Sequence, residues 1–227
     1  GGIVIKPTDE RLKDNENIIV ASYNTAAPWG NILQGTGSNK RARLFGQQIN
    51  DHLPDVLGAI NWFGVDDCAT TVYVPMYASI TEIPYAYREG NGSMMKFKPD
   101  AAFWIFNLVS NFAYTRYCDI ETVRRDLHRS FKDETAKIEG DLREEAANNP
   151  QNVAKKLTEY SAKASENTMQ TWQNLFASLF VKYVDGNIKA ETAKGFKDNG
   201  HDPRIPGDII FEGYGEAWKR AVAESDK

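Results

Sequence analysis

The sequence is poor in the residues that build metal sites and disulfide frameworks. Its 227 residues contain two cysteines, Cys68 and Cys118, and three histidines, His52, His128 and His201. The histidines are scattered singly, and neither cysteine has the spacing of a metal ligand. Nothing in this pattern indicates a metal site or a disulfide framework.

Long apolar runs and a strong excess of one charge are also absent. No run approaches the length of a membrane span, and the net charge of -4 gives no reason to expect nucleic acid or an anionic membrane as a partner. Basic residues cluster at 40–43 and at Arg124–Arg125. Acids and amides lie close to both clusters, so solvated surface is the favoured interpretation. Apolar residues at 41% and charged residues at 26% are typical of a globular protein with a real core.

The first half of the chain has the composition of loops and strands. Turn formers dominate the stretch to about Asn50, where only 18–23 is predicted as a strand. Two more strands are predicted at 56–63 and 70–77, where β-branched and aromatic residues dominate, with a turn at 64–67. Since Pro75 interrupts ladder pairing, the sheet is expected to end near it in an edge or an irregular segment.

The second half changes to a helical period. Apolar residues recur every three or four positions from Pro99 to about Ala147, and again from Val153 to about Asp185. The short link between them, which contains Pro150, predicts an antiparallel helical hairpin. A short helix is expected at 216–224. The chain is thus divided into a loop-rich segment with antiparallel strands (1–98), a helical layer with the hairpin (99–190) and a tail (191–227), together one domain.

Few motifs carry chemistry when the residues are taken by themselves. The glycines and lysine of 35–40 lack the ending of a phosphate-binding loop, so a flexible loop is favoured. Asp66 and Asp67 form an adjacent carboxylate pair, which we interpret as a solvated turn because neighbouring side chains on a turn point apart. Glu82 and Glu89 flank an aromatic segment. Its mixture of rings and charges is typical of the edge of a binding site and nearly as typical of an ordinary loop.

Polar residues also interrupt the apolar stripe of the first predicted helix. Asn107 and Asn111 lie four positions apart, with Ser110 beside them. Polar groups next to an apolar stripe need hydrogen-bond partners. We favour the interpretation that they satisfy neighbouring backbone or cap a strand end, and direct substrate contact is the alternative.

Several uncommon residues recur in the order of one known family. The runs are Trp62-Phe63-Gly64-Val65-Asp66-Asp67, Tyr73-Val74-Pro75-Met76-Tyr77, Thr81-Glu82-Ile83-Pro84-Tyr85, Gly90-Asn91-Gly92, Ala101-Ala102-Phe103-Trp104 and Val109-Ser110-Asn111-Phe112-Ala113-Tyr114. The sequence resembles the dipeptidase A family, cysteine dipeptidases of the N-terminal-nucleophile (Ntn) hydrolase superfamily. The resemblance runs from about Leu53 to Asn187 and is most specific in its first half.

This resemblance implies a fold and a reaction. The family fold is an αββα sandwich, so the expected fold class is α+β: a partial Ntn-hydrolase sandwich of a few antiparallel strands with a long C-terminal helical hairpin. The family's nucleophile is a cysteine at the first position of the mature chain, activated by its own α-amino group. The intact enzyme would hydrolyse the peptide bond of short peptides through a thioester. It needs no cofactor.

The sequence departs from the family at the nucleophile. Residue 1 is Gly, and Cys68 and Cys118 have no attached free amine. We therefore expect the C-terminal portion of a larger cysteine dipeptidase, inactive alone, with an N-terminal catalytic half and a dipeptide as its partners. The alternative is a non-catalytic binding or assembly domain on the same scaffold, and translation that begins near Gly2 would favour it.

The resemblance also suggests candidate site residues and a compartment. The candidates are Arg41 and Arg43 for oxyanion support, unless they are surface-loop arginines, and Tyr77, Glu82 and Tyr87 for substrate binding. The helix pattern adds Asn107 and Asn111 to the substrate-binding candidates. A glutamate there would read a substrate α-ammonium. Homo-oligomers are expected to form through a sheet face left uncovered by the missing half. Export to the periplasm or outside the cell is favoured over the cytoplasm.

Overall fold

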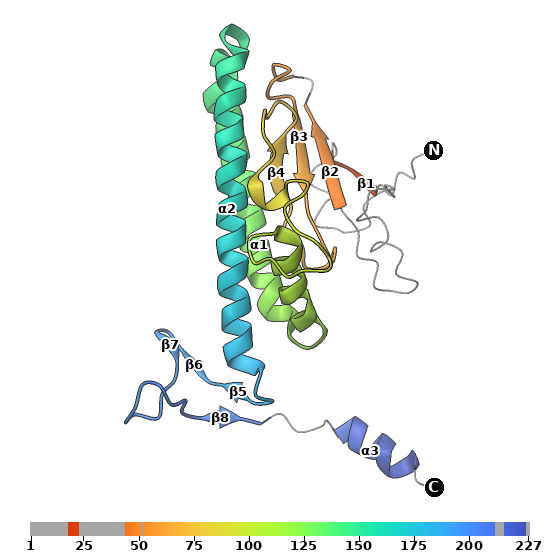
Figure 1. The fold of residues 1–227 in the computed structure, drawn as a ribbon, viewed down its shortest axis with the longest axis vertical. Coiled ribbons are helices and arrows are strands. Elements are labelled where there is room, and N and C mark those ends of the chain that lie inside the picture. Colours follow the sequence, from red (N-terminus) through yellow and green to blue (C-terminus); the bar gives the residue numbers. More distant parts are fainter. Residues whose placement is uncertain (1–17, 23–43, 51, 212–215, 226–227) are drawn as a thin grey trace. The chain divides into compact units, whose positions relative to one another are not determined.

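A four-stranded antiparallel sheet forms the first layer of the protein. The computed structural model describes residues 18–22, 44–50, 52–211 and 216–225. The sheet has the order β1-β2-β3-β4 (Figure 1). Its strands are β1 (Ile18–Ser22), β2 (Leu44–Ile49), β3 (Ala59–Phe63) and β4 (Val74–Tyr77). Pro75 lies in β4, an edge strand, as the sequence predicts.

Strand β2 corrects the prediction that only one strand precedes residue 50. It pairs on both sides, with Gly46 opposite Val20 of β1 and opposite Trp62 of β3. A glycine and two glutamines weaken its local strand signal, and pairing with two neighbours overrides that weakness. Strands β3 and β4 also begin later than predicted. A backbone hydrogen bond of 2.8 Å from Leu57 N–H to the Pro54 carbonyl closes a turn just before β3.

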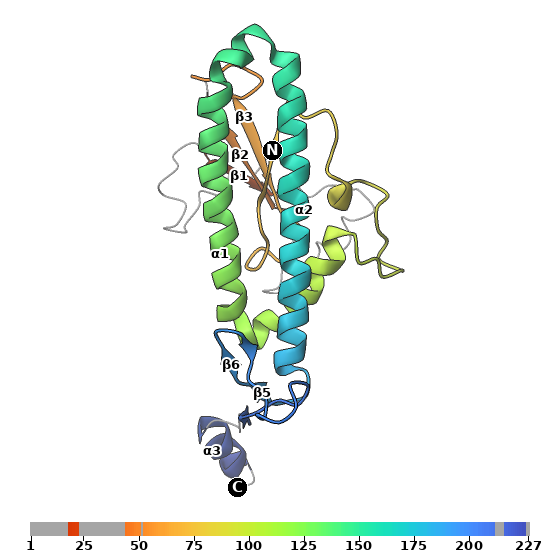
Figure 2. The same cartoon turned by 90° about the vertical axis from the view of Figure 1, so that its left-hand side faces the viewer.

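Two long helices form the predicted antiparallel hairpin. They are α1 (Ala102–Asn148) and α2 (Pro150–Tyr183), which run side by side in Figure 2. Pro150 occupies the first position of α2, where its missing N–H costs no hydrogen bond. The Asn149 carboxamide oxygen accepts the Asn152 N–H at 3.2 Å and so caps the helix. Helix α1 is kinked at Arg116, whose backbone (φ -136°, ψ 35°) is not helical.

The hairpin buries one face of the sheet. Ile60 of β3 and Tyr77 of β4 pack with Ala146, Val153 and Leu157 from the two helices. Near the start of α1, the ring of Phe106 stacks on that of Trp172 at 5.3 Å between centroids. These apolar contacts between strands and helices hold the sheet on the hairpin. All four residues of β4 are buried, and the residues of β3 are buried or partly buried.

The chain divides into two compact units, 1–175 and 176–227. The second contains two-residue strands, β5 (Ile188–Lys189) paired with β8 (Ile209–Ile210) and β6 (Glu191–Thr192) paired with β7 (Gly195–Phe196). The sequence did not predict these strands. It did predict helix α3 (Glu216–Ser225) within a residue.

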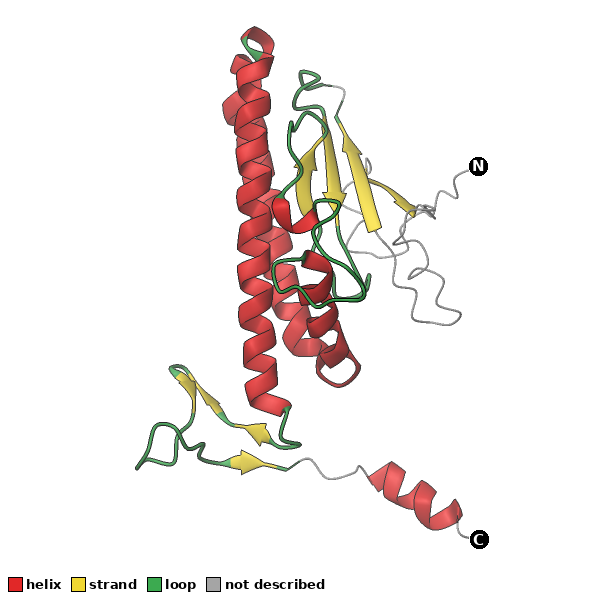
Figure 3. Cartoon of the chain, viewed as in Figure 1, coloured by secondary structure: helices red, strands yellow, loops and turns green. Residues whose placement is uncertain are grey.

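The fold class is α+β, as the mixture of helices and small antiparallel sheets in Figure 3 shows. Over the residues that the structure describes, no helix combines the length and apolar character needed to cross a membrane.

Candidate functional site

The connection from β3 to β4 contains a buried carboxylate. Asp66 is only 6% exposed and has a left-handed backbone with φ of 68°. Its two carboxylate oxygens accept hydrogen bonds from α1: Oδ1 from Asn107 Nδ2 at 3.1 Å and Oδ2 from Ser110 Oγ at 2.7 Å. A buried carboxylate needs such donors because it has left water. Helix α1 thereby fixes both the position and the orientation of the Asp66 side chain.

This arrangement changes two interpretations of the sequence. The solvated-turn interpretation is wrong for Asp66, since its side chain is buried and hydrogen-bonded to α1. Asn107 Nδ2 donates to that side chain, and Ser110 Oγ contacts both that side chain and the Asn107 carbonyl, the latter at 3.0 Å. Asn111 does bind backbone, because its Nδ2 donates to the Asn107 carbonyl at 2.6 Å.

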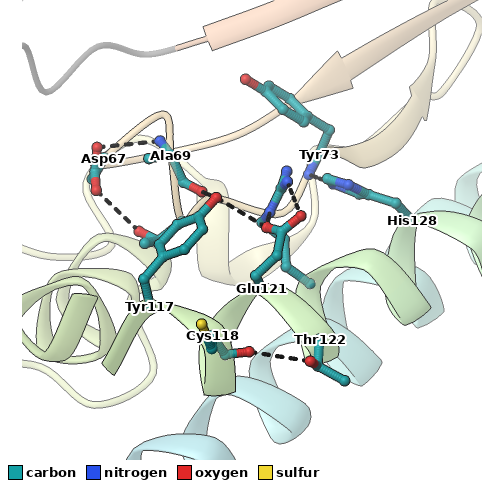
Figure 4. A network of polar contacts seen from close by, with 10 residues as sticks. Asp67, Ala69, Tyr73, Tyr117, Cys118, Glu121, Thr122 and His128 are labelled. Carbon is teal, nitrogen blue, oxygen red and sulfur yellow. Dashed lines mark hydrogen bonds and ion pairs between the residues drawn. The ribbon is translucent and has the colours of Figure 1, made fainter. Parts of the chain in front are cut away.

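Asp67 organises the next turn. Its Oδ1 accepts the Ala69 N–H at 3.2 Å, and its Oδ2 accepts the Thr70 hydroxyl at 3.4 Å (Figure 4). This turn leaves Cys68 and Ala69 exposed. The Tyr117 hydroxyl of α1 lies 3.4 Å from the Ala69 carbonyl, so the exposed turn is also held against the helix.

An ion pair continues the network along α1. Glu121 binds Arg124 through two contacts, of 2.7 and 3.0 Å, and its Oε2 also accepts from the Tyr117 hydroxyl at 3.1 Å (Figure 4). The side chains of Arg124 and Glu121 are only 12% and 15% exposed. The solvated-surface interpretation is therefore wrong for Arg124, although Arg125 is exposed.

His128 closes the network at the start of the next strand. Its Nε2 accepts the backbone N–H of Tyr73 at 2.8 Å, and the two rings stack at 5.5 Å between centroids. An accepting Nε2 requires the neutral imidazole. The pKa of His128 is lowered to about 4, chiefly by burial and also by the charge of Arg124, while Glu121 partly opposes the two. This histidine stays neutral at physiological pH and acts as an acceptor for the backbone.

The thiol on the exposed turn is not activated. Although Cys68 is exposed as a residue, partial burial of its sulfur raises its pKa, and the neighbouring Asp67 carboxylate raises it further. Thiolate is the nucleophilic form, so a raised pKa lowers reactivity at neutral pH. Cys118 is an exposed free cysteine on α1.

The substrate-binding candidates named from the sequence lie in three places. Asn107 and Asn111 adjoin Asp66, as described above. Tyr77 lies in the core, and burial, reinforced by the charge of Glu139, raises its pKa. Glu82 and Tyr87 lie on the connection between β4 and α1, where their surroundings differ.

Glu82 is exposed and 3.4 Å from Arg88. The Tyr87 ring packs edge-to-face on Phe63 at 5.7 Å, and burial raises the pKa of the Tyr87 hydroxyl. The oxyanion candidates Arg41 and Arg43 lie outside the described residues.

Sequence reasoning missed the part played by Glu121, Arg124 and His128. The spacing of Glu121 and Arg124 permits a helical ion pair, but nothing local indicates that the pair is nearly buried. His128 gives no signal at all, because its partner is a backbone N–H of a residue that is 55 positions away. Among the described residues, no group of three or more His, Cys, Asp and Glu side chains is placed to hold a metal ion.

The comparison with known protein families identifies the class. The family model described as peptidase family C69 matches residues 18–130, which include the whole Asp66–His128 network. This segment of the chain belongs to peptidase family C69, the dipeptidase A family of cysteine peptidases, which are hydrolases. The match begins earlier than the resemblance from Leu53 and ends before Asn187. No curated protein matches the chain.

Proposed function

We propose that these 227 residues are the C-terminal portion of a dipeptidase that cleaves the peptide bond of short peptides through a thioester on an N-terminal cysteine. The nucleophile comes from a separate part of the enzyme. The sheet and the hairpin supply one strand layer and one helical layer of an αββα sandwich. The match of residues 18–130 to peptidase family C69 carries this proposal.

The two cysteines of the chain support the proposal that the nucleophile comes from a separate part of the enzyme. Cys68 and Cys118 are internal residues, so neither has the free α-amine that would act as the base. The pKa of Cys68 is raised rather than lowered, which is opposite to the requirement for a nucleophile at neutral pH. The network around Asp66 and His128 then has a structural role, because it holds the connection between β3 and β4 on α1.

The proposal is tested by a complementation assay. The purified chain is mixed with a dipeptide, alone and together with a polypeptide that begins with cysteine and carries the N-terminal half of a C69 dipeptidase. We expect no hydrolysis by the chain alone and hydrolysis in the mixture. Alkylation of the added N-terminal cysteine should abolish it.

Two further variants separate the alternatives. Cys68→Ala and Cys118→Ala should leave the activity of the mixture unchanged. Hydrolysis by the chain alone that disappears in either variant would contradict the proposal. A mixture that binds the dipeptide without ever cleaving it would favour the alternative, a non-catalytic binding domain on the same scaffold.

A further inference from the structure

A pocket of about 310 Å³ lies between helix α2 and the segment that joins β4 to α1. Its polar lining consists of Tyr85, Asp100, Ser165, Glu166, Gln170 and Gln173, and Met169 and two alanines form the apolar part. A hydrogen bond of 3.1 Å from Gln173 Nε2 to the Pro99 carbonyl ties the segment to the helix beside the pocket. The volume is at the lower end of the range for small-ligand sites.

The lining is rich in hydrogen-bond acceptors. Asp100 Oδ1 has no hydrogen-bond partner among the described residues, although Lys98 Nζ lies 3.7 Å from it, and Asp100 Oδ2 accepts the Tyr85 hydroxyl at 3.2 Å. Glu166 is exposed and makes no ion pair with a described residue. The amide nitrogens of both glutamines are engaged, Gln170 Nε2 with Asn174 at 3.0 Å and Gln173 Nε2 with Pro99. Their carbonyl oxygens remain as acceptors. Such a set of groups favours a ligand that only donates, and that carries positive charge.

Ser165 supplies a hydroxyl on the α2 side of the pocket. It lines the pocket and is only 2% exposed, yet its hydroxyl makes no hydrogen bond within the described part of the chain. By contrast, the buried hydroxyl of Thr168, one turn further along α2, bonds to the Ala164 carbonyl at 2.8 Å. Since Ser165 lines the pocket, its hydroxyl is available there to a polar group of a bound molecule.

Lys98 of the chain itself shows that Tyr85 and Asp100, at the edge of the pocket, attract a positive charge. Its ammonium lies 5.3 Å from the centre of the Tyr85 ring, donates to the Tyr85 hydroxyl at 3.1 Å, and is 3.7 Å from Asp100 Oδ1. An ammonium over an aromatic face and beside a carboxylate is a favourable arrangement. Glu166 and Ser165, on α2, are not contacted by this lysine.

We propose that this pocket binds the protonated amine of a small organic molecule, with Glu166 as the principal carboxylate, Ser165 and the glutamine oxygens as acceptors, and Met169 against the alkyl part. The site shares no residue with the Asp66–His128 network. It does not depend on the proposed peptidase activity, and its test does not use hydrolysis.

The test is a titration of the isotope-labelled full chain with n-butylammonium, followed by NMR at the side-chain amides of Gln170 and Gln173. The neutral 1-butanol, of the same size, is the matched ligand. Glu166→Gln should weaken butylammonium binding by about tenfold, as expected for loss of a charged hydrogen bond. The control Glu159→Gln changes an exposed glutamate elsewhere on α2 and should leave binding unchanged.

A third variant has the opposite expected sign. Lys98→Met removes the internal ammonium and frees Asp100, so it should strengthen butylammonium binding by roughly threefold or more. Equal shifts with butylammonium and butanol, or equal effects of Glu166→Gln and Glu159→Gln, would overturn the proposal. Weaker binding of butylammonium by Lys98→Met, with an unchanged circular dichroism spectrum, would also overturn the proposal.

Discussion

At the scale of single residues, two neighbouring aspartates have different environments. Asp66 is left-handed and buried, with hydrogen bonds from Asn107 and Ser110 of α1. Asp67 is half-buried and bonds only within its own turn. A buried carboxylate whose donors lie on another element links the two elements, whereas a turn carboxylate stabilises the turn alone.

This difference predicts unequal costs for the two alanine variants. Asp66→Ala removes the acceptor of Asn107 Nδ2, leaves Ser110 Oγ with the Asn107 carbonyl alone, and should lower the free energy of unfolding by about 3 kcal/mol. Asp67→Ala loses the contacts of an exposed turn and should lower it by about 1 kcal/mol. Urea unfolding followed by circular dichroism measures both. Equal losses would mean that the Asp66 hydrogen bonds contribute no more than those of the turn.

His128 predicts a pH dependence of stability. Its pKa is about 4 in the folded chain and near 6.5 in an unfolded one, so the unfolded chain binds the proton more tightly. Stability is therefore complete above pH 6.5 and falls as the pH decreases toward 4. The loss attributable to this residue is roughly 3 kcal/mol, because each pKa unit corresponds to about 1.4 kcal/mol.

The measurement is the midpoint of urea unfolding between pH 7 and pH 4, for the original chain and for His128→Gln. The variant should show a shallower decrease, since its side chain does not titrate. His201→Gln, which changes an exposed histidine, is the control and should follow the original chain. If His128→Gln and the original chain had the same pH slope, His128 would not be neutralised by burial.

At the scale of elements, the connection between β3 and β4 packs so closely that its glycine has no room for a side chain. A Cβ on Gly64 would lie 2.8 Å from Thr71 Oγ1 and 2.9 Å from its Cγ2. Thr71 is itself buried, and its Oγ1 accepts the Val65 N–H at 3.0 Å. Thr71 therefore cannot move aside without losing that hydrogen bond. The glycine of the Trp62–Asp67 run is required by packing.

Two glycine-to-alanine variants test this packing requirement, and their expected changes in stability have opposite signs. Gly64→Ala should destabilise the chain by about 2 kcal/mol through overpacking. Gly140→Ala lies on an exposed position of α1 with no atom near its added carbon, and should stabilise it by about 1 kcal/mol through helix propensity. Thermal unfolding of the two variants is the measurement. Stabilisation by Gly64→Ala would show that the connection has more room than these contacts allow.

At the scale of the whole molecule, apolar side chains remain exposed on the segment between β4 and α1. Met95 is 95% exposed and Phe97 53%, and Ile83 and Met94 are also exposed. Clusters of exposed apolar residues favour association. The expectation of homo-oligomers stays a prediction, now placed on this segment.

Size-exclusion chromatography with light scattering tests that prediction. The chain should elute with a mass above its 25.5 kDa and bind an apolar dye. A Met95→Ser, Phe97→Ser double variant should lose most of the dye signal, whereas Val222→Ser, on α3, should not. A monomer without dye binding would contradict it.

The sequence by itself determined the features that depend on neighbours along the chain. The helical period predicts α1 and α2, Pro150 marks their junction, and the motif around Trp62–Asp67 indicates the peptidase family. Local sterics and periodicity suffice for these. The tertiary structure alone decided that Gly46 lies in a central strand, that Asp66 is buried against α1, and that His128 binds Tyr73. Each of these depends on partners far away in sequence, and burial removes water from a group only after those partners have come together.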